Sequence, residues 1–230
     1  MTKTQKNPLQ SAIKTRAQIP SLNLAKIGIV SRDYRDTFPN GYRDFSYTLP
    51  DVLNLMDGKD CDAVLFSLFS ITPRGSFNPR EAFEGLRNIK AIFLEEFQDG
   101  KNRKAGRYVI YYKTQSVWKE YEFYQVFGTI TGKSQEEISD FVDNELPKRV
   151  LGNCCILLCG ETNGIKYSKS DKMIHDDFGL RKAIPPTVNL ILNPIHDRMM
   201  RFEMKLKRKF LSKNHRWVIS VWNKGKQDRN

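Results

Sequence analysis

A cysteine stands at the end of an apolar run in the second half of the chain. Residues 152–159 read GNCCILLC, and the polar turn GETNG follows Cys159 at once. Ligands of open α/β sheets gather at the carboxyl ends of strands, so a thiol in this place can meet a substrate. An ionised thiol is a nucleophile for acyl transfer. The alternative is a packed core thiol, because free cysteine is among the most buried residue types.

The segments around this cysteine alternate between two patterns. Short apolar and β-branched runs predict strands, and amphipathic or proline-started runs predict helices. We expect strands at 24–30, 62–71, 90–97, 107–130, 152–159, 187–193 and 216–223, and helices within 48–61, 78–88, 134–146 and 197–213. This alternation indicates an α/β fold, and the fully apolar strands predict sheets that are covered on both faces.

The length of 230 residues suits one domain with short arms. We expect a basic arm at 1–20, one α/β domain at 21–225 and a basic tail at 226–230. No run approaches the roughly 18–20 apolar residues of a membrane span, and the first twenty residues have no apolar core typical of a signal peptide. Four cysteines in a chain of this length do not resemble a disulfide framework. We therefore expect a reduced, cytoplasmic protein without membrane contact, and the sequence leaves its oligomeric state open.

Several motifs, taken in order, resemble the carbon–nitrogen hydrolase, or nitrilase, superfamily. The segment ILLCGETNG (156–164) is similar to the nucleophile strand of that family, and VNLILNPIH (188–196) is similar to its next strand. The helix and strand that follow have their counterpart in residues 204–225, while 26–30 and 60–71 resemble the first two strands. The resemblance implies an α-β-β-α sandwich with mixed sheets covered by helices.

The resemblance also implies a catalytic set of cysteine, lysine and glutamate. It assigns the nucleophile to Cys159. The lysine, which stabilises the tetrahedral intermediate, corresponds to Lys113 or, as the alternative, to Lys119, both within YYKTQSVWK (111–119).

The glutamate that serves this family as general base has no clear counterpart. Its expected position lies in the run FSLFS (66–70), which holds no carboxylate. Serine does not accept a proton at neutral pH as glutamate does. The base would then be Glu95, at the end of the next strand beside Glu96, or Glu161, which follows the nucleophile.

Two functions remain open at this stage. The first is a hydrolase without a cofactor, in which Cys159 attacks the C–N bond of a small amide or nitrile and a thioester is then hydrolysed. The second is a catalytically inactive scaffold of the same fold that binds nucleic acid or an acidic protein. The missing glutamate favours the scaffold, and the intact turn after Cys159 favours the enzyme.

The net charge of +12 resides at the two ends of the chain. Residues 1–20 carry +4 and residues 201–230 carry +8, so the part between them is neutral. Such ends attract phosphate backbones or acidic partners, and they are equally typical of solvated termini. Within 205–217 basic residues alternate with Phe210 and Trp217. The candidate nucleic-acid contacts are Lys205, Lys207, Arg208, Lys209, Lys213 and Arg216.

Other chemistry has weaker support in the sequence. His175-Asp176-Asp177 and His196-Asp197 carry metal-ligand side chains, but their spacing is not diagnostic, and we predict no metal site. The glycines at 152, 160 and 164 fit neither of the common phosphate-binding loops.

Overall fold

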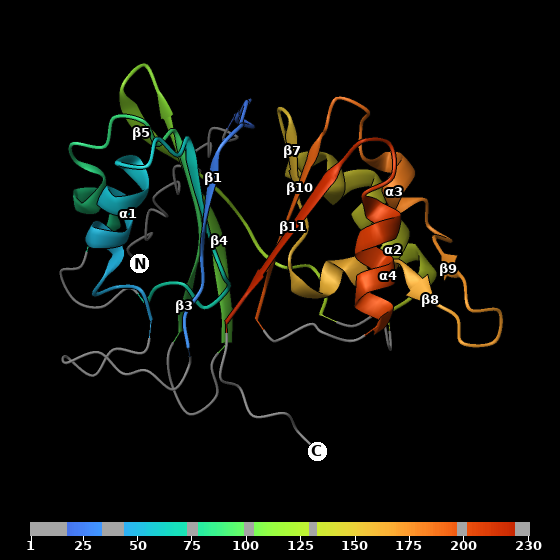
Figure 1. Cartoon of the computed structure of the whole chain (residues 1–230). Coiled ribbons are helices and arrows are strands. Elements are labelled where there is room, and N and C mark those ends of the chain that lie inside the picture. Colours follow the sequence, from blue (N-terminus) through green and yellow to red (C-terminus); the bar gives the residue numbers. More distant parts are fainter. Residues whose placement is uncertain are drawn as a thin grey trace, which may run out of the picture.

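Two β-sheets face each other at the centre of the computed structural model, and helices lie on the outer side of each sheet (Figure 1). The structure describes residues 18–33, 44–72, 78–98, 104–128, 133–196 and 202–223. The predicted α/β class is confirmed. The arm expected at 1–20 is described only from residue 18, and the tail expected at 226–230 lies outside the described residues.

The first sheet is mixed and has the strand order β1-β2-β3-β4-β5. Its strands are β1 (Ile27–Val30), β2 (Ala63–Phe66), β3 (Ala91–Gln98), β4 (Lys104–Thr114) and β5 (Val117–Phe123). The first three are parallel, and β4 and β5 continue the sheet as an antiparallel hairpin. Helix α1 (Leu49–Asp57) and the 3-10 helix η1 (Pro79–Phe83) cover its outer face.

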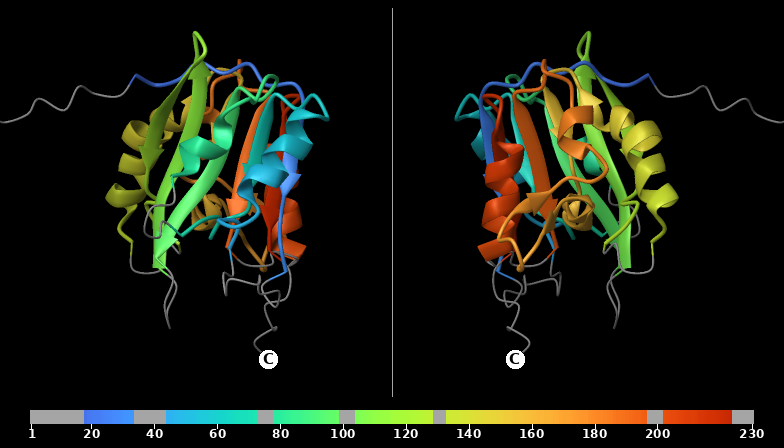
Figure 2. Two further views of the ribbon diagram at one scale, coloured as in Figure 1. Left: turned by 90° about the vertical axis from the view of Figure 1, so that its left-hand side faces the viewer. Right: turned by 90° about the vertical axis from the view of Figure 1, so that its right-hand side faces the viewer.

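The second sheet has the order β11-β10-β7-β6, with three parallel strands and an antiparallel edge. Its strands are β6 (Val150–Leu151), β7 (Cys154–Ile156), β10 (Leu190–Ile195) and β11 (Trp217–Trp222). Its outer face carries α2 (Gln135–Asp140), α3 (Leu180–Ala183) and α4 (Phe202–Leu211), as Figure 2 also shows. Helix α2 continues as a π-helix, η2 (Phe141–Glu145), and a 3-10 helix, η3 (Leu146–Arg149). A small hairpin, β8 (Lys166–Tyr167) and β9 (Ile174–His175), completes this side.

Three apolar clusters fill the spaces between these layers. One lies between the sheets and contains Leu65, Phe93 and Ile156. The second packs the first sheet against α1 and η1, and the third packs the second sheet against its helices. Neighbouring residues of one strand point to opposite faces, so Ile156 joins the inner cluster and Leu157 joins an outer one. This double burial is the reason that the strands read as continuous apolar runs.

Several strand ends differ from the expected ones; β2, for example, stops at Phe66 and not at residue 71. Two of the differences concern the edge that holds Cys159. Strand β7 stops at Ile156, and Cys159 begins a short 3-10 helix, η4 (Cys159–Gly164). Strand β10 runs on through Pro194 to Ile195. The Leu192 carbonyl accepts the Leu157 N–H, so the backbone groups of residue 192 face β7. The backbone nitrogen of Pro194, two residues later, faces the same side, where β7 has already ended. A proline is tolerated there because no ladder hydrogen bond is lost.

A matched pair of glycines tests how closely the chain before β1 packs on the second sheet. Gly152 and Gly179 share a φ of +67°, but a Cβ at Gly152 would lie 1.9 Å from the Leu22 carbonyl oxygen, whereas a Cβ at Gly179 would meet nothing within 4 Å. Gly179→Ala should lower the free energy of unfolding by only about 1–2 kcal/mol, the cost of placing a residue with a Cβ in a left-handed conformation. Gly152→Ala should cost a further ~1–3 kcal/mol from the clash, measured by urea unfolding. An equal loss of unfolding free energy in the two variants would contradict the close packing of Leu22 on Gly152.

Candidate active site at the carboxyl ends of the strands

Three chemically active side chains come together where parallel strands of both sheets end. Glu95 lies near the end of β3, Cys159 follows β7, and His196 follows β10. Glu95 belongs to the first sheet and the other two residues to the second, so the group forms across the gap between the sheets. This is the edge at which ligands of parallel sheets gather.

His196 is the centre of this group. Its Nε2 lies 3.1 Å and 3.2 Å from the two carboxylate oxygens of Glu95. The Cys159 thiol is a further polar neighbour of the ring, and its interaction with the imidazole is one of the causes that raise the pKa of His196. The side chains of His196 and Glu95 are 15% and 4% exposed, and Cys159 is half-buried. A cysteine, a histidine and a carboxylate linked in this order are the arrangement used by thiol nucleophiles.

The electrostatics of the group favour a charged imidazole. Burial acts to lower the pKa of His196, but the interactions with the Cys159 thiol and with the Glu95 carboxylate outweigh it and raise this pKa to about 9. At neutral pH the ring is therefore an imidazolium next to Cys159.

The run FSLFS (66–70) and the neighbouring strand β4 hold Glu95 in place. The Phe69 N–H donates to Glu95 Oε2 at 2.6 Å, and the Gly106 N–H donates to Oε1 at 3.1 Å. The Ser70 hydroxyl accepts the backbone N–H of Glu95 at 2.9 Å. The run FSLFS (66–70) thus supplies one donor, the Phe69 N–H, and one acceptor, the Ser70 hydroxyl, that orient Glu95 on the neighbouring strand.

Phe69 shows that this orientation has a conformational cost. Its φ is +57°, a value that bulky residues rarely adopt. The conformation directs its N–H to Glu95, and its ring packs on His196 with centroids 4.2 Å apart. Strained backbone persists where surrounding contacts over-determine it, which is common at functional sites.

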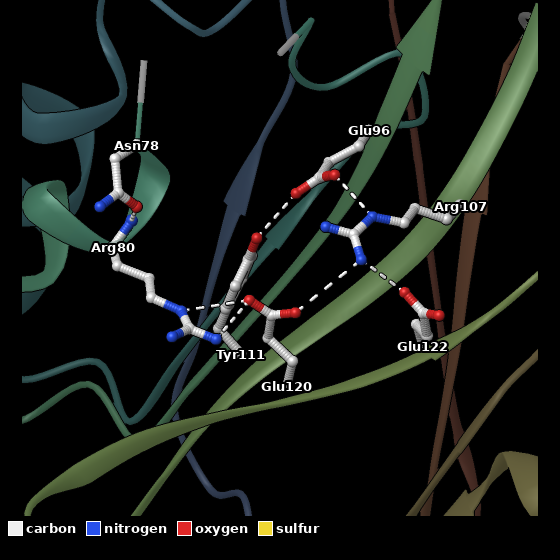
Figure 3. Close-up of polar contacts among 7 residues, drawn as sticks. All are labelled: Asn78, Arg80, Glu96, Arg107, Tyr111, Glu120 and Glu122. Atoms are coloured by element: carbon white, nitrogen blue, oxygen red, sulfur yellow. Dashed lines mark hydrogen bonds and ion pairs between the residues drawn. The ribbon is translucent and has the colours of Figure 1, made fainter. Parts of the chain in front are cut away.

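Glu96 faces the opposite side of the sheet and cannot replace Glu95. Figure 3 shows it in a polar ladder on the outer face, where Tyr111 OH and Arg107 Nε each donate to it at 2.7 Å. Arg107 also contacts Glu122 at 2.5 Å. The ladder ends in the ion pair of Glu120 with Arg80. Both Glu96 oxygens have partners there, whereas Glu95 contacts His196.

Glu161 is bonded to the turn that holds Cys159. It is fully buried, its Oε2 accepts the Leu158 N–H at 2.8 Å, and its Oε1 accepts from Arg149 and from the Val126 N–H, both at 3.0 Å. Burial raises the pKa of Glu161 and lowers that of Arg149, and the opposite charge of the partner offsets part of each shift. With both oxygens engaged, Glu161 fixes the backbone next to Cys159, which corrects its expected role as a catalytic base.

The lysines do not approach the cysteine. Lys113 and Lys119 lie at the amino-terminal end of β3, because Tyr112 pairs with both Ala91 and Lys119. Glu95 is at the carboxyl end, about 15 Å along the strand. Lys113 Nζ donates to the Leu86 carbonyl at 2.8 Å on the outer side of the sheet. The placement of either lysine beside Cys159 is therefore wrong, and the cation next to the thiol is His196.

The other three cysteines are core residues. Cys61, Cys154 and Cys155 are buried, and all four described cysteines are free thiols. Burial raises the pKa of Cys154 to about 12 and raises that of Cys155 as well. Cys159 is thus the one cysteine of the described chain with access to solvent and a charged neighbour.

The basic residues of α4 and the turn after it do not form one free face. Lys207 is buried, and its Nζ donates to Asn163 Oδ1 at 3.0 Å. Arg216 is buried as well and donates to the carbonyl oxygens of residues 181, 184, 185 and 188. As candidate nucleic-acid contacts these two residues need correction, since they hold the fold together. Lys205, Lys209 and Lys213 are exposed, and Arg208 is half-buried.

Within the described part of the chain, no group of three or more His, Cys, Asp or Glu side chains could hold a metal ion. His175 instead pairs with Asp171 at 2.7 Å, and Asp176 accepts the N–H groups of Leu180 and Arg181. Asp197, which the sequence placed beside His196, lies outside the described residues.

The sequence matches no protein-family model, and no curated protein matches it. The resemblance to nitrilases therefore stays a prediction, and the function has to be inferred from the geometry. None of the described helices is long and apolar enough to cross a bilayer.

The sequence alone did not reveal the role of His196. The position of His196 could have been recognised, because a histidine directly after an apolar strand lies at the same sheet edge as Cys159. The long separation between His196 and Glu95 in the chain hid their contact, which depends on how the two sheets face each other.

Thiol labelling tests the exposure and activation of Cys159. At neutral pH, iodoacetamide should label Cys159 about tenfold or more faster than Cys61, Cys154 and Cys155, because those thiols react only after local opening. Peptide mass spectrometry gives the rate at each site. Cys159→Ser should remove the fast phase alone, and equal slow labelling of all four thiols would contradict the site.

The raised pKa of His196 predicts a pH-dependent stability. The imidazolium contributes fully below about pH 6.5, and its contribution is lost as the pH rises through about 9. Relative to His196→Gln, the wild type should therefore lose up to about 3 kcal/mol of unfolding free energy over this range. Urea unfolding at both ends of the range measures the loss. If the unfolding free energies of the wild type and His196→Gln changed equally with pH, the ion pair of His196 with Glu95 would be refuted.

Proposed function

We propose that the protein is a cysteine-dependent hydrolase of C–N bonds, with Cys159 as the nucleophile, His196 as the acid and base, and Glu95 as the group that orients the histidine. The observation that carries this proposal is the contact of one imidazole with both the Cys159 thiol and the Glu95 carboxylate.

The first step forms a thioester. The Cys159 thiolate attacks the carbonyl carbon of an amide, and the imidazolium of His196 gives its proton to the leaving nitrogen as the C–N bond breaks. The amine departs, and the acyl group remains on sulfur. Glu95 stabilises the imidazolium and fixes the orientation of the ring.

The second step restores the enzyme. The neutral His196 takes a proton from water, the hydroxide attacks the thioester carbonyl, and the C–S bond breaks. The carboxylic acid leaves, and His196 is again an imidazolium beside a thiolate. Each proton that His196 gives in the first step is regained in the second.

The backbone after Cys159 supports this chemistry. The N–H groups of Cys159 and Gly160 belong to the first turn of η4, and the first N–H groups of a helix have no partners within it. Such groups can stabilise the negative charge that develops on the carbonyl oxygen. Glu161 and Arg149 keep the turn rigid, because they are buried and bonded to each other.

The helix–sheet–sheet–helix layering and the cysteine after β7 are compatible with a diverged nitrilase-type sandwich. In this interpretation Glu95 and His196 together replace the family glutamate, and the imidazolium replaces the family lysine. A small amide is the substrate class that this acid–base pair suits best, because its leaving nitrogen must be protonated. No cofactor is needed.

An activated ester tests the first step without knowledge of the substrate. p-Nitrophenyl acetate should acetylate Cys159 in a rapid burst, seen as p-nitrophenolate absorbance and as one acetyl group on the Cys159 peptide by mass spectrometry. His196→Gln should slow the burst by about 10²–10⁴-fold, and Glu95→Gln should slow it less.

The matched control is Lys113→Met, which should acetylate at the wild-type rate because Lys113 lies at the far end of β3. Ammonia release from a panel of small amides and nitriles then tests turnover. A burst that is unchanged in His196→Gln, or acetylation spread over all four cysteines, would overturn the proposal.

A further inference from the structure

A second feature lies at the other end of the second sheet. An open pocket of about 580 Å³ forms where α4 ends and β11 begins, and it is lined by Arg208, Lys209, Ser212, His215, Arg216, Trp217 and Val218. Trp217 pairs with Leu190 at the start of β10, whereas His196 follows the end of β10. The pocket is therefore separate from the thiol site by the whole length of the sheet.

The charge of the pocket has one sign. Among its described lining residues are two arginines and one lysine and no carboxylate. The Arg216 guanidinium is held by four carbonyl oxygens, which orient it without neutralising it. Burial lowers the pKa of Arg208 and Arg216 because their charged guanidinium groups lose part of their hydration, and a bound anion would offset that loss.

Trp217 gives the pocket an aromatic surface. Its side chain is 74% exposed, although tryptophan is usually highly buried. Its backbone N–H donates to the Asn189 carbonyl at 2.8 Å, so the start of β11 is fixed while the indole remains at the surface. An indole fixed beside arginine and lysine can stack on a base while the cations contact phosphate.

The turn before Trp217 places these groups together. Asn214 and His215 both have left-handed backbone conformations, with φ of 65° and 60°. The chain thereby reverses from α4 into β11 and brings the last turn of the helix beside the first residue of the strand. Lys213 lies near the same turn with its Nζ 5.3 Å from the Phe210 ring centroid, which adds a further exposed cation.

We propose that this pocket binds single-stranded nucleic acid, with Trp217 stacking on a base and Arg208 and Lys209 contacting the neighbouring phosphates. Single strands are favoured over duplexes because a base must be unpaired to stack on the indole. An acidic peptide would satisfy the positive charge but would leave the exposed indole without a planar partner.

A fluorescently labelled oligonucleotide of about a dozen deoxythymidines tests the proposal by anisotropy with the full chain. Trp217→Leu should weaken binding by about 5- to 150-fold, which corresponds to the loss of one stacking interaction. Lys209→Gln should weaken binding and reduce the slope of log affinity against log salt by about 0.7.

Two matched controls come from the other end of the same helix. Phe202 is 66% exposed, and Lys205 is an exposed lysine on α4. Phe202→Leu and Lys205→Gln should both bind like the wild type, with thermal unfolding as the check that every variant is folded.

Three results would overturn the proposal. The first is wild-type affinity in Trp217→Leu, which would show that charge alone causes binding. The second is equal or tighter binding of a duplex, and the third is binding of polyglutamate in place of the oligonucleotide. Loss of this binding would leave the thiol chemistry untouched, because the two sites share no residue.

Discussion

The central strands β2, β3, β7 and β10 are covered on both faces, and this constraint determines where polar chemistry can occur on them. Their inner faces pack on each other and their outer faces pack on helices, so the middle of these strands must be largely apolar. Reactive side chains are then confined to the strand ends. Glu95, Cys159 and His196 occupy one such edge, and because they come from both sheets, their geometry depends on how the two layers are held together.

The carboxylate of the site does not lie where the resemblance to nitrilases predicts a glutamate, within residues 66–70. It resides on β3, while the loop after β2 supplies the groups that orient it. Phe69 takes an unfavourable backbone conformation to donate to Glu95 and to cover the histidine ring. In the proposed mechanism the imidazole combines two tasks in one residue, since it carries the proton and is also the positive charge beside sulfur.

Periodicity and composition were sufficient to predict the α/β class, the location of most strands and the position of Cys159 at a strand edge. They were less informative about pairs of residues that meet across the sheets. Glu95 was recognised as a carboxylate at a strand end, but its neighbour His196 is 101 residues away in the chain. Lys113 looked suitable because it ends a strand, yet β4 runs antiparallel to β3 and carries it to the wrong edge. The basic run predicted Lys207 and Arg216 as surface contacts for nucleic acid, but both are buried. Burial depends on neighbours in space that a single sequence does not show.

The buried pair of Arg149 and Glu161 has a consequence for how this protein can evolve. The turn that presents the sulfur is secured by that pair and by backbone hydrogen bonds, none of which involves the thiol itself. The bonds that hold this turn therefore do not depend on the side chain at position 159, which has to pack only against the inner apolar cluster. A lineage could exchange the nucleophile, or lose it altogether, and inherit an intact scaffold on which selection could build another role.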